Sequence, residues 1–166
     1  MGLQQSKEEL LYQHVNYGNV DGIRTLRGQG AGLEWIDKEG KTPLMLACMR
    51  PDLFDVAKVL IELGANVNAY RPGSHCGTAL HHAAKKRLQQ TVHLLLSHGA
   101  NPFIPNDDCN TALDLAREKG HVNVVRALKG RLWLFCGWKR EKHAPAFFGC
   151  NCPPFMTKKL GLLFSP

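Results

Sequence analysis

The sequence predicts an all-α fold, a solenoid of about four helix-turn-helix units with short β-hairpin fingers. The first observation is a motif that recurs at intervals of 36 and 33 residues, as Thr42-Pro43-Leu44, Thr78-Ala79-Leu80 and Thr111-Ala112-Leu113. The second is a common frame behind each Thr, with Ala47, Ala83 and Ala116 five residues on and paired Leu and Val residues after them. Because no unit can bury its Leu and Val face alone, neighbouring units have to stack into one continuous core.

A period near 33 residues, with a Thr-Pro-Leu start, is typical of ankyrin repeats. The frame predicts repeats at about 8–37, 38–70, 71–103 and 104–130. The first repeat lacks the Thr-Pro-Leu start, and Gly18-Asn19 marks its inter-helix turn. Terminal repeats are expected to be atypical, since their outer face meets water. The longer first interval places an extra residue in the loop near Pro51.

Each part of the frame has a local physical reason. A Thr before a helix can cap the orphan amide groups of its first turn. Pro43 stands at the first helical position, where the missing amide is not needed. Gly64 and Gly99 follow the second helices, where glycine tolerates a positive φ. The elements are therefore an inner helix after each Thr and an outer helix that ends before each Gly-Ala.

The net charge of +7 is unevenly distributed along the 166 residues. Residues 1–130 hold 15 Lys and Arg against 13 Asp and Glu, and residues 131–166 hold 6 against 1. A nearly neutral body argues against nucleic acid as a partner, since such a surface needs basic residues on one face. The basic C-terminal part leaves acidic partners and anionic lipid open.

The termini and the cysteines bear on localisation. Six scattered cysteines, no secretory h-region and no apolar run of about 20 residues predict a cytoplasmic protein that does not cross a membrane. The start Met1-Gly2-Leu3-Gln4-Gln5-Ser6 fits N-myristoylation of Gly2, which would give reversible membrane contact. The alternative is that residues 1–7 are a flexible polar N-terminus. Residues 131–138 are expected to pack as an apolar C-terminal cap, and residues 139–166 to be a weakly structured tail.

Three segments carry a resemblance to a known family: residues 1–7, residues 64–73 with their Tyr-Arg-Pro-Gly insert, and residues 94–102. Through them, residues 1–140 resemble the N-terminal ankyrin region of the plant ankyrin-repeat RING-type E3 ubiquitin ligases (XBAT type). The resemblance implies a module that recruits a partner for ubiquitination. In that family a C-terminal RING binds two zinc ions and recruits the ubiquitin-loaded conjugating enzyme.

This chain offers no RING of its own. A RING needs eight Cys and His ligands, whereas after residue 130 the sequence holds only Cys136, His143, Cys150 and Cys152. We therefore expect a truncated paralogue, a splice form or a gene-model fragment, with zinc bound only in a longer, RING-bearing form. No catalytic residue, metal site or cofactor is predicted for the chain itself.

The resemblance also implies where a partner binds, because ankyrin proteins use their fingertips and the exposed face of their first helices. Fingertip positions include Asp37, Lys38, Glu39, Asp107 and Asp108. The predicted partner-binding residues are Met45, Met49, Arg50, Arg71, His75, His82, Lys85 and Lys86. The Met side chains suit an adaptable apolar patch, and the lysines suit an acidic partner. The alternative for Lys85-Lys86-Arg87 is an ordinary solvated helix end.

Two further residue types have structural interpretations. His81 occupies the fourth position of the repeat motif, where an imidazole hydrogen-bonds within and between capping turns. Cys76 and Cys109 each stand two residues before a Thr, on adjacent fingers. A spacing of roughly 8–10 Å between packed helices exceeds the usual disulfide separation, so both are expected to remain thiols.

Three functions remain open from the sequence. The first is a scaffold that recruits a protein without transferring ubiquitin. The second is a fragment or isoform of an active E3 ubiquitin ligase. The third is a membrane-tethered ankyrin adaptor with no role in the ubiquitin pathway.

Overall fold

The fold is known from a computed structural model, which describes residues 6–72 and 77–136. For residues 131–136 it describes the backbone alone. The predicted myristoyl acceptor Gly2, the fingertip residue His75 and the predicted tail 139–166 lie outside the described residues.

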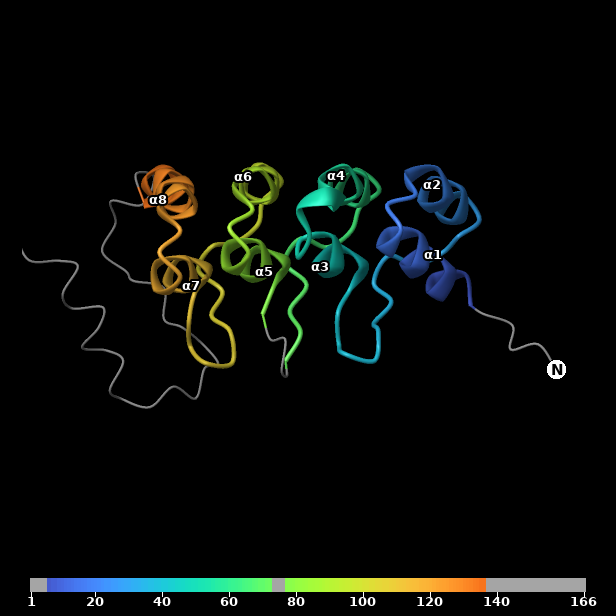
Figure 1. Cartoon of the computed structure of the whole chain (residues 1–166), viewed down its shortest axis with the longest axis horizontal. Coiled ribbons are helices and arrows are strands. Elements are labelled where there is room, and N and C mark those ends of the chain that lie inside the picture. Colours follow the sequence, from blue (N-terminus) through green and yellow to red (C-terminus); the bar gives the residue numbers. More distant parts are fainter. Residues whose placement is uncertain (1–5, 73–76, 137–166) are drawn as a thin grey trace, which may run out of the picture.

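The described chain forms two rows of helices that run the length of the molecule, as the all-α repeat frame predicted (Figure 1). Each repeat contributes one helix to the inner row, then a turn, then one helix to the outer row. The fingers extend from the inner row on the side away from the outer row (Figure 1). The inner row is α1 (Lys7–Asn16), α3 (Pro43–Ala47), α5 (Ala79–Lys85) and α7 (Ala112–Glu118). The outer row is α2 (Val20–Gly28), α4 (Phe54–Glu62), α6 (Gln89–Ser97) and α8 (Val122–Cys136).

The core runs through all four repeats. Every described repeat buries large aliphatic side chains between its two helices and against its neighbours, and full burial of each contributes about 1.5–3 kcal/mol. The largest fully buried residues include Leu11, Ile23, Leu44, Leu60, Leu80, Leu95, Val124 and Leu128. One continuous core confirms that the units are stabilised by stacking.

The helix starts confirm the capping interpretation. Thr42 accepts a hydrogen bond from the backbone amide of Met45, and Pro43 opens α3. Thr111 forms a reciprocal capping box with Asp114. Ser6 also caps α1, by accepting from the amide of Glu9 at 3.1 Å, so this serine has a structural role independent of any lipid.

The turns and loops fall where the frame placed them. Gly18 and Asn19 separate α1 from α2, and Gly18 has a φ of +73°. The extra residue near Pro51 is accommodated in a short 3-10 helix, η1 (Pro51–Leu53), which precedes α4. Within residues 131–138, predicted to pack as an apolar C-terminal cap, residues 131–136 continue α8 as helix.

Candidate partner-binding surface

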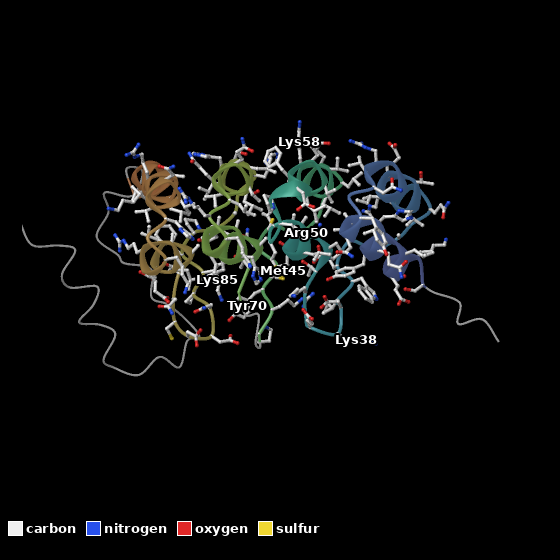
Figure 2. The ribbon with its side chains drawn as sticks, viewed as in Figure 1. Lys38, Met45, Arg50, Lys58, Tyr70 and Lys85 are labelled. Atoms are coloured by element: carbon white, nitrogen blue, oxygen red, sulfur yellow. The ribbon has the colours of Figure 1, made fainter. Side chains whose placement is uncertain are left out.

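The candidate surface consists of the fingers and the inner helices that carry them, which we call the finger surface. It comprises the finger segments 37–41, 71–72, 77 and 106–110, with helices α3, α5 and α7. Lys38 lies at a finger, and Tyr70 and Lys85 lie on the same side of the molecule, whereas Lys58 projects from the outer row (Figure 2).

Two fingers are closed by the same hydrogen bonds. The amide of Asp37 donates to the carbonyl of Lys41 at 3.1 Å, and the amide of Asn106 donates to that of Asn110 at 2.9 Å. In each finger the first side chain folds back, so that Asp37 and Asn106 accept two backbone amides with their Oδ1 atoms. Such side-chain turns fix a loop without a sheet. In the third finger the backbones of Arg71 and Gly77 form an antiparallel bridge.

Tyrosines hold two of the fingers in place, which the sequence analysis missed. Tyr12, on α1, donates its hydroxyl to Asp37, and Tyr70 donates to Asp107 of the next finger. Burial alone would raise the pKa of Asp37, but the bonds from Tyr12 and from backbone amides outweigh it and lower the pKa. Burial and the bond to Asp37 raise the pKa of Tyr12 well above its ordinary value. In the sequence, each bonded pair appears only as a Tyr that precedes an Asp by 25 or 37 residues. Because the two spacings differ, no sequence motif predicts these hydrogen bonds.

Side chains in the loops before the fingers connect successive repeats. Glu34 accepts the backbone amide of Asn66 at 2.9 Å, and Asn68 accepts that of Asn101 at 2.7 Å. Glu34 and Asn68 occupy equivalent positions, four residues after Gly30 and Gly64. Asn68 also donates to the carbonyl of Gly99 at 3.1 Å. The polar bonds along this edge therefore fix the spacing of neighbouring fingers.

His81 forms the predicted hydrogen bonds within and between capping turns. Its Nδ1 accepts the amide of Thr78 at 3.0 Å, and its Nε2 lies 3.2 Å from the carbonyl of Asn110 in the next repeat. Since a carbonyl can only accept, the neutral ring carries its proton on Nε2. Burial lowers the pKa of His81. The structural interpretation of His81 is confirmed.

The structure corrects the placement of two predicted partner-binding residues. Met45 is 1% exposed and His82 is 6% exposed, so neither side chain lines an open surface. Their helices, α3 and α5, pack against inner helices on both sides, which covers faces that an isolated helix would present to solvent.

The next three predicted residues are half-buried and differ in what they contact. Met49 follows α3 at its C-terminal end. Arg50 already has partners within the chain. Its guanidinium donates to the carbonyl of Asn16 at 3.1 Å and pairs with Asp52 at 2.6 Å. The Nε atom of Arg71 is buried and, among the described residues, donates no hydrogen bond.

Lys85 and Lys86 are exposed at the end of α5. Within residues 6–72 and 77–136, neither forms a salt bridge. The structure thus leaves Met49, Arg71, Lys85 and Lys86 as predicted residues that a partner can reach.

Cys109 is not the thiol that the sequence predicted, because it takes part in a disulfide bond. Cys76 lies outside the described residues. The prediction used the spacing of packed helices, whereas Cys109 lies in a finger loop, whose Cα position that spacing does not determine. Cys48, by contrast, is a free and fully buried thiol, and burial raises its pKa.

The described residues hold no group of three or more His, Cys, Asp or Glu side chains that could bind a metal ion. Among the helices of that same part of the chain, none is both long enough and apolar enough to span a membrane.

Comparison with known proteins gives relatives along the whole chain. The sequence is 76% identical over all 166 residues to "Probable E3 ubiquitin-protein ligase XBOS34" of Oryza sativa subsp. japonica. It is 60% identical to "Putative E3 ubiquitin-protein ligase XBAT35" and 52% identical to "Putative E3 ubiquitin-protein ligase XBAT34", both of Arabidopsis thaliana. The chain spans 32%, 36% and 45% of the length of these three proteins. The resemblance to the XBAT-type proteins is confirmed.

The repeat frame itself is matched by the family described as "Ankyrin repeats (3 copies)", over residues 2–71 and 70–131. The match covers the helix pairs from α1 to residue 131 of α8. The chain belongs to the ankyrin-repeat family.

Proposed function

We propose that this chain recruits a protein partner to an E3 ubiquitin-protein ligase through its finger surface. Ankyrin repeats indicate a protein-interaction role. The observation that carries the proposal is similarity over the whole chain to three plant proteins named as E3 ubiquitin-protein ligases. In a longer protein, a RING with its zinc ions would supply the contact with the conjugating enzyme.

The chemistry of the finger surface favours a partner with oxygen-rich, acidic groups. Lys85 and Lys86 are exposed cations without a salt bridge in the described chain. The buried Nε of Arg71 lacks an acceptor there, and an unpaired buried donor costs about 1–3 kcal/mol. His75, which lies outside the described residues, remains part of the proposed partner-binding set.

The fixed fingers support recognition by a preorganised surface. Bonds from Tyr12 to Asp37 and from Tyr70 to Asp107 tie two fingers to tyrosines that lie earlier in the chain. A surface held in its binding conformation loses less conformational entropy when a partner binds.

The test is a ubiquitination assay with the chain fused ahead of a RING domain of known activity. Proteins that bind the chain from a plant extract are purified and supplied as substrates, together with a conjugating enzyme. We expect the fusion to modify a bound protein much faster than the RING domain alone does. The unfused chain should transfer no ubiquitin.

A double variant tests the surface. Arg71→Glu with Lys85→Glu should abolish both binding and the gain in rate, whereas Arg126→Glu, at an exposed position of α8, should leave both unchanged. Equal rates for the fusion and the RING domain alone would overturn the proposal, and so would a double variant that binds as well as the parent chain.

We also propose that Gly2 carries a myristoyl group, which would add reversible membrane contact. The support is the start Met1-Gly2 with Ser6, although Ser6 also serves as the cap of α1. Metabolic labelling with an alkyne-bearing myristate should mark the parent chain and not Gly2→Ala. An unlabelled parent chain would refute the modification.

A further inference from the structure

The inter-helix turn of repeat 3 departs from local preferences at two adjacent positions. Arg87 has a φ of +63°, at the position where repeats 1 and 4 have Gly18 and Gly120 with φ of +73° and +69°. The equivalence is exact in hydrogen bonding, because the next residue in each turn donates to the carbonyl five residues earlier, at 2.9–3.0 Å. A side chain in this left-handed conformation is strained, and glycine is not.

The residue after Arg87 is also unfavourable for the fold. Leu88 stands at the N-cap of α6 and offers no side-chain hydrogen bond. In repeat 1 the same position holds Asn19, whose Oδ1 accepts the amide of Gly22 at 3.0 Å. Strained backbone positions that the surrounding structure holds in place cluster at functional sites.

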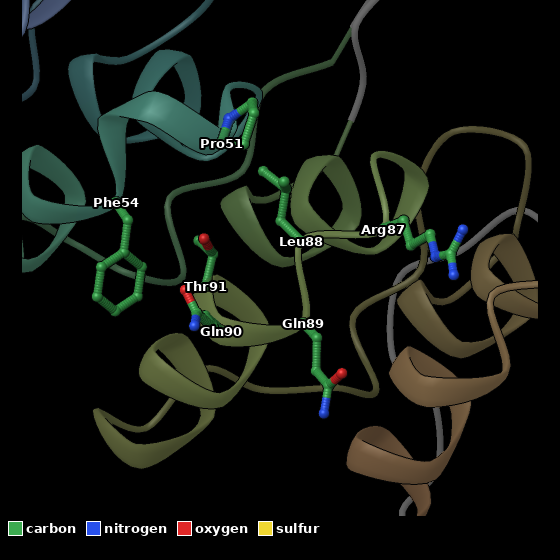
Figure 3. Close-up of a pocket in the computed structure, with 7 residues that line it drawn as sticks. All are labelled: Pro51, Phe54, Arg87, Leu88, Gln89, Gln90 and Thr91. Carbon is green, nitrogen blue, oxygen red and sulfur yellow. The ribbon is translucent and has the colours of Figure 1, made fainter.

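A cavity of about 240 Å³ opens beside this turn, between repeats 2 and 3. Phe54 and Pro51 form its wall on the repeat 2 side, and residues 87–91 form the opposite wall (Figure 3). Phe54 and Leu88 are half-buried and supply apolar surface, while Gln89 and Gln90 supply amide groups. The cavity suits one apolar side chain with polar backbone around it.

Arg87 extends away from Phe54, toward repeat 4 (Figure 3). There it joins a group of cations that we call the turn edge, residues 85–88 and 117–121. The turn edge holds five Lys and Arg residues and one carboxylate, Glu118, which pairs with Lys119 at 3.5 Å. Arg87 forms no salt bridge within the described chain. Repeats 1 and 2 have no such excess, because Arg50 pairs with Asp52 in their only charged turn.

The two turns of this edge are joined to each other. The Nε2 atom of His121 lies 3.2 Å from the carbonyl of Lys85, which links the turn of repeat 4 to the end of α5. The cavity and the cations therefore lie in a row across repeats 2, 3 and 4, and this bond connects the turns of repeats 3 and 4. Two exposed carboxylates lie close to Phe54 in the sequence, at the repeat 2 end of this row. They are Asp52, which pairs with Arg50, and Asp55.

We propose that the cavity and the turn edge form a second protein-binding site, which takes an extended segment with an apolar residue followed by acidic residues. The apolar side chain enters the cavity against Phe54 and Leu88. The carboxylates that follow pair with Arg87 and its neighbouring lysines. A flat membrane surface would meet the cations but leave the cavity empty, and nucleic acid would need a longer basic stripe. The turn edge shares the C-terminal ends of α5 and α7, Lys85 among them, with the finger surface, but the cavity and Arg87 lie outside that surface. The proposal does not rest on the proposed function.

The test uses short fluorescent peptides in a Gly-Ser background, each with one Leu followed by three Glu. Matched peptides replace Glu by Gln, or Leu by Ser. We expect the Leu-Glu peptide to bind at least about tenfold more tightly than either matched peptide at low salt, and to weaken as salt rises. Vesicles containing phosphatidylserine and single-stranded DNA are titrated in parallel.

The decisive variant is Arg87→Gly, which removes the cation and relieves the strained backbone. It should lose at least about fivefold in peptide affinity while its Tm rises, so that weaker binding cannot reflect misfolding. Arg126→Gln removes an exposed cation from α8 and should bind as the parent chain does. The proposal is wrong if the Gln peptide binds as well as the Glu peptide, if Arg87→Gly keeps full affinity, or if vesicles or DNA bind more tightly than any peptide.

Discussion

The turns of repeats 1 and 3 share a backbone conformation and hydrogen bonds but differ in side chains. Repeat 1 uses Gly18 for the left-handed residue and Asn19 for the cap, and each residue suits its position. Repeat 3 has Arg87 at the left-handed position and Leu88 at the cap, and neither residue type suits its position. The same turn therefore forms with or without local support, because packing of the flanking helices determines it. Where a repeat omits that support, its side chains are available for binding.

At the end of repeat 3 that carries the finger, by contrast, the side chains do support the local structure. There Thr78 and His81 make polar bonds within the capping turn and to the next finger, and Asn68 of repeat 2 is bonded to the loop that ends repeat 3. Substitutions at the finger end should lower the free energy of unfolding. Substitutions at the inter-helix turn of repeat 3 should lower it only slightly or raise it. Four predictions test that contrast.

The largest effect is expected for His81→Ala. The substitution leaves the amide of Thr78 and the carbonyl of Asn110 without their partner and opens a cavity in a buried site. We expect a loss of about 3 kcal/mol in the free energy of unfolding, measured by urea denaturation. His93→Ala, on the exposed face of α6, is the matched control and should change stability by less than about 0.5 kcal/mol. A loss no larger than the control's would show that the finger end is not held by His81.

Asn68→Ala should have the next largest effect. It removes the bonds to Gly99 and Asn101, which connect the loops of successive repeats. Because Asn68 is half-buried, we expect a loss of about 1–2 kcal/mol, with faster amide hydrogen exchange at Asn101. Unchanged exchange at that amide would contradict the inter-repeat role of Asn68.

Arg87→Gly should raise the free energy of unfolding by about 1 kcal/mol, since glycine adopts the left-handed conformation without strain. The mirror substitution, Gly18→Ala, should lower it by a similar amount in the same urea experiment. If both variants shift stability in the same direction, the backbone comparison between repeats 1 and 3 fails.

The smallest effect concerns pH. The pKa of His81 is lowered in the folded protein, mainly by burial, from an ordinary value of 6.5. Its contribution to stability is thus complete above the unfolded pKa and is lost as pH falls from there through the folded pKa. Protonation of Nδ1 would break the bond from Thr78. Between pH 7 and about pH 5 the parent chain should lose stability that His81→Ala does not lose; parallel pH profiles for the two would exclude His81 as the titrating group.

Prediction from sequence was most successful where a structure depends on residues within one helical turn. The caps Thr42 and Thr111, the opening Pro43 and the Gly18-Asn19 turn each follow from side-chain chemistry and nearby amides. It failed for Met45 and Cys109. The exposure of Met45 depends on helices from two other repeats, and the disulfide of Cys109 depends on how a finger loop lies.

Parts of the candidate sites needed the same longer-range information. The bond from Tyr12 to Asp37 joins residues 25 positions apart, and no local pattern announces it. Arg87 was visible as part of a basic run, and alignment of the repeats would have placed it opposite Gly18 and Gly120. Its φ and the cavity beside it emerged only from the packed chain.

By itself, the sequence determined the repeat period, the positions of the helices and the ankyrin fold, because these follow from periodic apolar residues and from caps that act over a few residues. Tertiary structure alone decided which inner-helix side chains remain exposed, how the fingers are tied to neighbouring repeats and where a cavity opens. Those properties depend on contacts between residues of different repeats, and the stacking of the units determines these contacts.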